Sequence, residues 1–167
     1  MRGLTDAGAH GAIWIVIGVI VGVWLRRPLV FVAMLAAEGV SSIVDGALKN
    51  AIGRQRPPLV DPRVHPLIPL PHDPSMPSGH AMMAFAGATL LALVAPRLRW
   101  AFLALAVGVA LSRVYLGVHF PSDVMVGAVI GAAIGALAGG ALRLSEQLAA
   151  GTLRDGRRRY RRPERMD

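Results

Sequence analysis

The amino-acid sequence predicts an all-α fold: a polytopic transmembrane bundle of about five helices, with its reactive side chains gathered at one membrane interface. Hydrophobic residues make up 54% of the 167 positions and 19 residues are glycine, a composition that suits helices packed closely in lipid. Residues 74–96 and 124–142 contain no formally charged side chain. Each of these stretches is long enough to cross a hydrocarbon core of about 30 Å. The chain has no cysteine, which excludes disulfides and thiolate metal sites.

The hydrophobic helices are expected at 7–25, 28–48, 78–95, 98–117 and 121–142. Tight turns containing arginine and proline separate the first helix from the second and the third from the fourth. The apolar run 11–25 has the length of a signal-peptide core. Its basic pair follows the run instead of preceding it, however, and no small-residue cleavage site comes after it. We therefore expect a retained membrane helix.

The long connection at 53–76 is rich in proline and is not expected to form regular helix. It lies within a transmembrane domain predicted to span residues 1–145. The chain is expected to fray from Arg143 onward, and residues 146–167 form a basic tail. We interpret this tail as a cytoplasmic topology anchor that contacts anionic lipid headgroups. Nucleic-acid binding is the alternative, and nothing else in the chain supports it.

The distribution of positive charge predicts the topology. Five crossings place the ends of the second and fourth helices, and the starts of the third and fifth, on one side of the membrane. That side carries six of the 18 lysines and arginines, namely Arg2, Lys49, Arg54, Arg56, Arg63 and Arg113. Cytoplasmic loops are enriched in these residues. The arginine-rich opposite side is therefore predicted to be cytoplasmic, and the first side to face outward, in a multi-pass protein of the cell membrane.

The outward side combines three cations with the start of a helix. Lys49 and Arg56 stand seven residues apart, about two helical turns and so on one face, and Arg113 ends a later helix. Such clustered cations are costly at a membrane interface unless an anion joins them. Ser78 and Gly79 open the third helix, where free N–H groups favour an anion and glycine permits its close approach. These residues predict a phosphate-binding pocket.

Two histidines and a carboxylate complete the predicted site. His119 and Asp123 are four residues apart at a helix start, so Asp123 is expected to hold one ring nitrogen and leave the other as a nucleophile. His80, which opens the neighbouring helix, is expected to protonate the departing oxygen as a general acid. Water would then hydrolyse the phosphohistidine with His80 acting as the base. Because the two histidines need opposite protonation states, a bell-shaped pH profile is expected.

The blocks Lys49-x6-Arg56-Pro57, Pro77-Ser78-Gly79-His80 and Ser112-Arg113-x5-His119-x3-Asp123 resemble the three-part signature of the phosphatidic acid phosphatase type 2 (PAP2) superfamily. That superfamily includes bacterial membrane lipid phosphatases and soluble vanadium haloperoxidases. The resemblance implies catalysis without metal or cofactor, with His119 as nucleophile, His80 as acid and Asp123 as the partner of His119. It implies phosphate binding by five residues: Lys49, Arg56, Ser78, Gly79 and Arg113.

One departure from the family pattern concerns the number of helices. Typical membrane members have six, and this sequence predicts five. Leu4-Thr5-Asp6 resembles the approach to the second family helix, so the first one is expected to be missing. A wall for lipid access and a homodimer contact are the features that this difference affects. The role of Ser112 stays open between capping, packing and a part in the site.

Several of these residues also have interpretations outside the proposed catalysis. His119 and Asp123 could be metal ligands, but the neighbouring cations would repel a divalent ion, and no metal is expected. Asp45 precedes Lys49 by four residues and either orients it or forms a purely structural ion pair. Glu38 is expected to make an interhelical hydrogen bond. His72 and Asp73 are interpreted as solvated surface residues, with the mouth of the pocket as the alternative.

Four glycines recur at every fourth position of the last helix: Gly127, Gly131, Gly135 and Gly139. This small-xxx-small pattern lets helix backbones approach closely in lipid. The stripe continues the side of the helix that begins near Asp123, so we expect it to pack within the chain, behind the site. A homodimer contact is the alternative.

Among lipid phosphates we favour a polyprenyl diphosphate such as undecaprenyl diphosphate, because an outward site suits the recycling of a cell-wall carrier in a bacterium. Phosphatidylglycerol phosphate, phosphatidate and decaprenylphosphoryl-phosphoribose phosphate stay open. A non-catalytic lipid-binding scaffold would be expected to lack one of the histidines. A transporter would carry polar residues through the depth of the membrane, and haloperoxidase chemistry belongs to a soluble fold.

Overall fold

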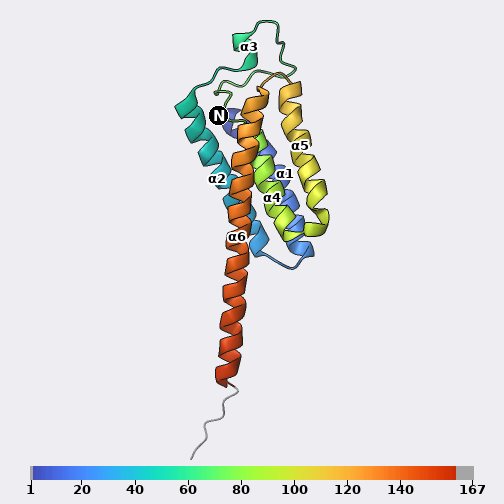
Figure 1. Ribbon diagram of the computed structural model, residues 1–167, viewed down its shortest axis with the longest axis vertical. Coiled ribbons are helices and arrows are strands. Elements are labelled where there is room, and N and C mark those ends of the chain that lie inside the picture. The colour runs from blue at the N-terminus through green and yellow to red at the C-terminus, as the bar shows by residue number, and fades with distance from the viewer. Residues whose placement is uncertain (1, 161–167) are drawn as a thin grey trace, which may run out of the picture.

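The computed structural model describes the backbone of residues 2–160 and the side chains of residues 11–151 (Figure 1). Its long helices are α1 (Arg2–Trp24), α2 (Leu29–Ile52), α4 (Gly79–Val94), α5 (Arg99–Tyr115) and α6 (Pro121–Tyr160). A four-residue helix, α3 (Pro57–Val60), and a 3-10 turn (Pro96–Leu98) lie in the connections. The predicted all-α bundle of five long helices is confirmed.

Helix α4 is the centre of the bundle. It contacts α1, α2, α5 and α6, and most of its side chains are buried. Small residues allow this close packing: at Gly87, a Cβ atom would lie 2.8 Å from the ring of Trp14 on α1. Because α4 is enclosed by the other helices, the motif at its first turn is held from several sides.

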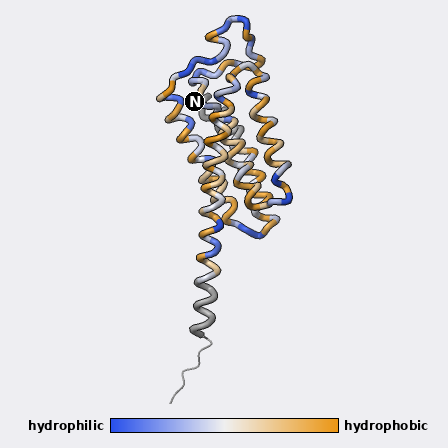
Figure 2. The backbone as a smooth tube through the Cα atoms, in the orientation of Figure 1, coloured by the Kyte–Doolittle hydropathy of each residue, from blue (hydrophilic) through white to orange (hydrophobic). Residues whose placement is uncertain are grey.

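Three stretches of the described chain are long and apolar enough to cross a membrane: Leu29–Val60, Pro96–Tyr115 and Pro121–Gly151. The apolar parts of α1 and α4, Gly11–Trp24 and Gly79–Val94, are shorter. Figure 2 shows hydrophobic residues along the helices, with hydrophilic ones concentrated in the long connection and in the turns at the other end. This pattern, with many large apolar side chains exposed on the helices, is that of a membrane protein.

The glycine stripe of α6 packs against the backbone of α4. A Cβ atom at Gly131 would lie 2.0 Å from the carbonyl oxygen of Met82, and one at Gly127 would lie 2.5 Å from that of Ser78. No side chain fits at such distances, so glycine is required where the two helices meet. The expected packing of the stripe within the chain is confirmed.

The long connection contains one helical turn that the sequence analysis excluded. Helix α3 begins with Pro57 and Pro58, at positions where a helix N–H has no intrahelical acceptor and the fixed φ of proline suits the helix. Proline therefore starts this short helix instead of preventing it. The chain from Asp61 to Ser78 is irregular, as expected.

Helix α6 does not end near Leu142, and the expectation of a frayed chain from Arg143 is wrong. The helix continues to Tyr160, past the end of the bundle (Figure 1). Arg143 donates to the carbonyl oxygen of Leu93 at 2.9 Å. One turn later Glu146 forms an ion pair with Arg27 of the α1–α2 turn. These contacts hold the helix where its hydrophobic pattern has ended.

Glu38 has no partner for the expected interhelical hydrogen bond among the side chains that the structure describes. Its side chain is buried on α2, and neither carboxylate oxygen has a hydrogen-bond partner among the described side chains. Its neighbours at this depth are Gly11 of α1 and Met83 of α4. Neither of these has a side chain able to donate a proton to the carboxylate.

Candidate active site

The ends of α2 and α5 and the starts of α4 and α6 meet at the predicted site. Ala81 on the first turn of α4 packs with Ala110 near the end of α5 and with Val124 on the first turn of α6. The backbone N–H of Ser78 also donates to the carbonyl oxygen of Asp123 at 3.0 Å. The starts of α4 and α6 are therefore joined directly, and the motifs carrying His80 and His119 lie at the same end of the bundle.

Arg56 lies at the centre of this end and is only 2% exposed. Its Nη1 donates to the carbonyl oxygen of Val118 at 2.9 Å and lies 3.3 Å from Nε2 of His119. Its Nη2 is 2.8 Å from Oδ1 of Asp73, and its Nε donates to the backbone oxygen of the same residue at 2.9 Å. The guanidinium thus has a fixed orientation, with one edge toward His119 and the other toward Asp73.

Lys49 contacts two carboxylates. Its Nζ lies 2.9 Å from Oδ2 of Asp45, one turn earlier on α2, and 2.6 Å from Oδ2 of Asp73. Asp45 in turn lies against the first turn of α4, because a Cβ atom at Gly79 would be 2.8 Å from its Oδ2. Asp45 therefore orients Lys49 toward the start of α4, and only glycine leaves room for that carboxylate.

His119 is held by a backbone carbonyl. Its Nδ1 lies 2.8 Å from the oxygen of Ser75, whereas Oδ2 of Asp123 is 3.7 Å from the same nitrogen. The first distance is that of a hydrogen bond and the second is too long for one. With Nδ1 donating to Ser75, the lone pair is on Nε2, the nitrogen that faces Arg56. The ring has the predicted tautomer, but Ser75 and not Asp123 accepts its hydrogen bond.

Asp123 acts on the ring of His119 indirectly, through Ser75. Its side chain is fully buried, and Oδ2 accepts hydrogen bonds from the Ser75 hydroxyl and from the backbone N–H of Phe120. Its other oxygen, Oδ1, lies 2.7 Å from Nη1 of Arg54. Asp123 therefore fixes the loop that presents the Ser75 carbonyl to His119.

Arg54 is a site residue that the sequence analysis counted only as outward charge. Besides its ion pair with Asp123, it donates to the Ser122 hydroxyl at 2.8 Å, and its guanidinium lies 4.3 Å from the centre of the Phe120 ring. A fully buried carboxylate needs a charged partner. Arg54 provides it, so the imidazole of His119 need not be protonated to balance Asp123. The need of a buried carboxylate for a cationic partner is the signal by which Arg54 could have been identified from the sequence.

The surroundings of His119 favour its neutral form. Burial lowers the pKa of this histidine, and the positive charges of Arg56 and Lys49 lower it further, to about 4. The carboxylate of Asp123 and the Ser75 carbonyl act in the opposite direction and do not outweigh these effects. His119 therefore keeps an unprotonated Nε2 at neutral pH, as a nucleophile requires, and in this structure that nitrogen accepts a hydrogen bond from Nη1 of Arg56.

Two of the predicted phosphate-binding residues, Arg113 and Ser78, differ in how the structure holds them. Nε of Arg113 donates to the Ser112 hydroxyl at 3.1 Å, and that hydroxyl donates to the carbonyl oxygen of Val109 at 2.6 Å. Among the described residues, Arg113 is therefore outside the network that joins Lys49, Arg56 and His119, although it lies at the same end of the bundle. Ser112 therefore bonds back to a carbonyl of its own helix and contacts Arg113. Ser78 is fully buried and precedes the first turn of α4.

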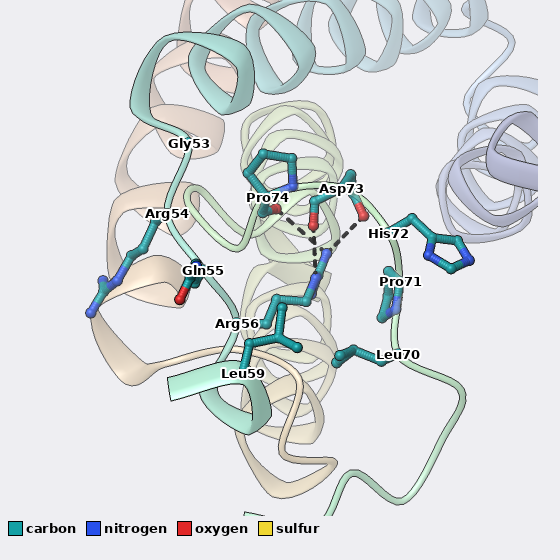
Figure 3. Close-up of a pocket in the computed structure, with 10 residues that line it drawn as sticks. All are labelled: Gly53, Arg54, Gln55, Arg56, Leu59, Leu70, Pro71, His72, Asp73 and Pro74. Carbon is teal, nitrogen blue, oxygen red and sulfur yellow. Dashed lines mark hydrogen bonds and ion pairs between the residues drawn. The ribbon is translucent and has the colours of Figure 1, made fainter. Parts of the chain in front are cut away.

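Asp73 is exposed, as the preferred interpretation expected, but its carboxylate also joins Lys49 to Arg56. It also lines a pocket of about 360 Å³ together with Arg56, Leu59, Leu70 and His72 (Figure 3). His72 is exposed at the edge of this pocket. Among the side chains described, no three histidines or carboxylates are placed to hold a metal ion together.

Comparisons with known proteins agree with this geometry. The sequence profile of the PAP2 superfamily matches residues 28–142. The decaprenylphosphoryl-5-phosphoribose phosphatase of Mycobacterium tuberculosis is 33% identical over 141 residues, which cover 81% of this chain and 75% of that protein. The undecaprenyl-diphosphatase of Sulfolobus acidocaldarius is 32% identical over 121 residues, covering 71% and 58%. The crystal structure of a transmembrane PAP2-type phosphatidylglycerolphosphate phosphatase from Bacillus subtilis matches with a TM-score of 0.62 and 28% identity, covering 83% of this chain and 74% of that one.

The matched region contains all three blocks of the signature, and the structure brings the blocks to one end of the bundle. The family match covers α2, α4 and α5 and the first part of α6. This chain therefore belongs to the PAP2 superfamily and is a membrane lipid phosphatase.

Proposed function

We propose that this enzyme removes the terminal phosphate of a polyprenyl diphosphate, such as undecaprenyl diphosphate, through a phosphohistidine intermediate and without a metal ion. The observation that carries the proposal is the state of His119. Its ring is buried, its lowered pKa favours the neutral form, and its unprotonated Nε2 lies 3.3 Å from Nη1 of Arg56 and near the charge of Lys49. A nucleophile whose lone pair faces a cation pair is suited to attack a phosphorus atom bound between those cations.

In the proposed mechanism, the phosphoryl oxygens bind Lys49, Arg56, Arg113 and the N–H groups at the start of α4, where Ser78 and Gly79 lie. A helix N-terminus favours such an anion. Nε2 of His119 attacks phosphorus as the bond from phosphorus to the bridging oxygen breaks. The electron pair stays on the departing oxygen, which takes a proton from His80. The hydrogen bond from Nδ1 to the Ser75 carbonyl stabilises the positive charge that develops on the ring.

The second step returns the enzyme to its starting state. A water molecule attacks the phosphorus atom, and His80, now neutral, accepts a proton from it. The phosphorus–nitrogen bond breaks and its electron pair returns to Nε2 of His119. The products are inorganic phosphate and polyprenyl phosphate.

Polyprenyl substrates are favoured for two reasons. The excess of arginine on the opposite side supports an outward-facing site with a cytoplasmic α6 terminus, which is where a bacterial cell-wall carrier would be recycled. In addition, both relatives compared above by sequence are named for substrates with a polyprenyl chain. Decaprenylphosphoryl-5-phosphoribose phosphate is the second candidate, because the relative named for it is covered over 75% of its length.

Phosphate release from a panel of lipids tests this assignment. With the protein in detergent and EDTA present, we expect the highest kcat/KM for undecaprenyl diphosphate and lower values for phosphatidylglycerol phosphate and phosphatidate. The decaprenylphosphoryl-phosphoribose phosphate in the same panel distinguishes the two polyprenyl candidates. Loss of activity with EDTA, restored by one divalent ion, would contradict the metal-free mechanism.

The activity is expected to fall on the acid side at a pH far below the ordinary pKa of histidine. Because its pKa is lowered to about 4, His119 stays neutral above that pH and gains a proton only below it. The value of kcat/KM, which reports the free enzyme, should therefore hold down to about pH 5 and fall through about pH 4. Loss of the His80 proton should end activity on the alkaline side. An acid limb above pH 6, with tryptophan fluorescence unchanged, would show that His119 is charged in the folded enzyme.

A further inference from the structure

The carboxylate of Asp73 lies where the proposed mechanism places the substrate. Its Oδ2 is 2.6 Å from Nζ of Lys49, and its Oδ1 is 2.8 Å from Nη2 of Arg56. Figure 3 shows this side chain facing the guanidinium from the irregular segment before α4. Two oxygens of one anion thus bridge the two cations, as two oxygens of a phosphoryl group would do.

The nucleophile is closed off from solvent in this structure. His119 is 4% exposed and Arg56 is 2% exposed, so a phosphoryl group reaches Nε2 only after another group has moved. The side chain of Asp73 is 47% exposed and lines the 360 Å³ pocket. The side chain of Asp45, the other carboxylate that contacts Lys49, is only 15% exposed, so of these two carboxylates Asp73 is the one next to open space.

The two cations keep other partners when Asp73 leaves. Lys49 remains paired with Asp45, and Arg56 still donates to the backbone oxygens of Val118 and Asp73. Both cations are therefore held in place for an incoming anion. Burial raises the pKa of Asp73, but Lys49 and Arg56 outweigh it and hold that pKa below its ordinary value. The carboxylate is thus charged at neutral pH, and a phosphate with more charge and more oxygens can displace it.

We propose that Asp73 is a further residue of the phosphate site, an internal competitor whose carboxylate occupies the place of the substrate phosphoryl group. Substrate then binds by exchange with this carboxylate, and the return of Asp73 displaces inorganic phosphate after each turnover. Without such a competitor, Lys49 and Arg56 would hold the product more tightly. The inference rests on the proposed function in one respect, namely that these two cations bind the phosphoryl group.

The test is the affinity of the purified enzyme for orthovanadate and inorganic phosphate, measured by calorimetry and as inhibition of lipid hydrolysis. In Asp73→Asn the competing charge is gone, and we expect both anions to bind about tenfold more tightly or better, as the loss of a charged hydrogen bond to a competitor implies. Asp73→Glu keeps the charge and should stay near the wild-type affinity. Asp73→Ala provides the same comparison if the Asn variant does not fold.

Asp61→Asn is the matched control. Asp61 belongs to the same connection and pairs with the exposed Arg63, so its substitution makes the same change in net charge away from the cation pair. It should leave both affinities unchanged, and equal tightening in this control would overturn the proposal. Unchanged or weaker anion binding in Asp73→Asn would also overturn it, because Asp73 would then only align the two cations. If neither the wild type nor the variant binds either anion, the proposed phosphate site itself is wrong. The proposed exchange of substrate with Asp73 is then wrong as well.

Discussion

Replacing His119 with alanine is expected to lower the rate of phosphate release by about 10⁴-fold or more, the scale seen when a catalytic nucleophile is removed. The variant lacks the only group placed to form the covalent intermediate of the proposed mechanism. Lys49 and Arg56 remain, so lipid binding should change much less than turnover. The measurement is kcat and KM for undecaprenyl diphosphate in detergent, with thermal unfolding recorded for each protein.

His65→Ala is the control for this experiment. His65 lies in the same outward connection and is exposed, so the variant should keep wild-type activity. If a folded His119→Ala protein retains a tenth or more of the activity, His119 is not the nucleophile.

The second large effect is expected from the glycine stripe. In Gly131→Leu, the added Cβ atom alone would lie 2.0 Å from the carbonyl oxygen of Met82, so α4 and α6 must separate. Overpacking of this kind costs about 1–3 kcal/mol and sometimes more. Here it also displaces the first turns of both helices, where Ser78 binds Asp123. We expect a protein that unfolds during extraction or is inactive when folded.

Gly140→Leu is the matched control for the stripe, since a Cβ atom at Gly140 would meet nothing within 4 Å. It makes the same substitution on the same helix and should keep both the yield of folded protein and the activity. Monodispersity in detergent, melting temperature and phosphate release check both variants. If Gly131→Leu only converts a dimer into an active monomer, the glycine stripe serves a homodimer contact and not the packing of α6 against α4.

The helices could be predicted because local patterns specify them. Long uncharged runs gave α4 and α6, and the spacing of the three signature blocks identified every residue that was proposed for the site. The end of α6 could not be found in the same way. The helix continues past Leu142, where Arg143 contacts α4 and Glu146 contacts the α1–α2 turn, and no local pattern contains these contacts.

The contacts within the site were less predictable than its members. The i and i+4 spacing of His119 and Asp123 suggested a direct hydrogen bond, but the folded loop inserts Ser75 between them. For the same reason, Arg54 had no predicted role, and Asp73 was expected only as a surface residue or at the mouth of the pocket. Their partners, Asp123 and Lys49, are 69 and 24 residues away in sequence. Such pairs are set by how the connection folds over the helix ends, and the proline-rich sequence does not reveal that path.

The central claim is that a neutral, buried His119 takes the phosphoryl group onto Nε2. Rapid quenching of the wild-type enzyme with undecaprenyl diphosphate labelled on its terminal phosphate tests this most directly, using alkaline conditions that preserve phosphohistidine. We expect transient label on the peptide that contains His119, lost as inorganic phosphate is released. Label on a different residue, or full turnover with no labelled protein at any time, would contradict the account.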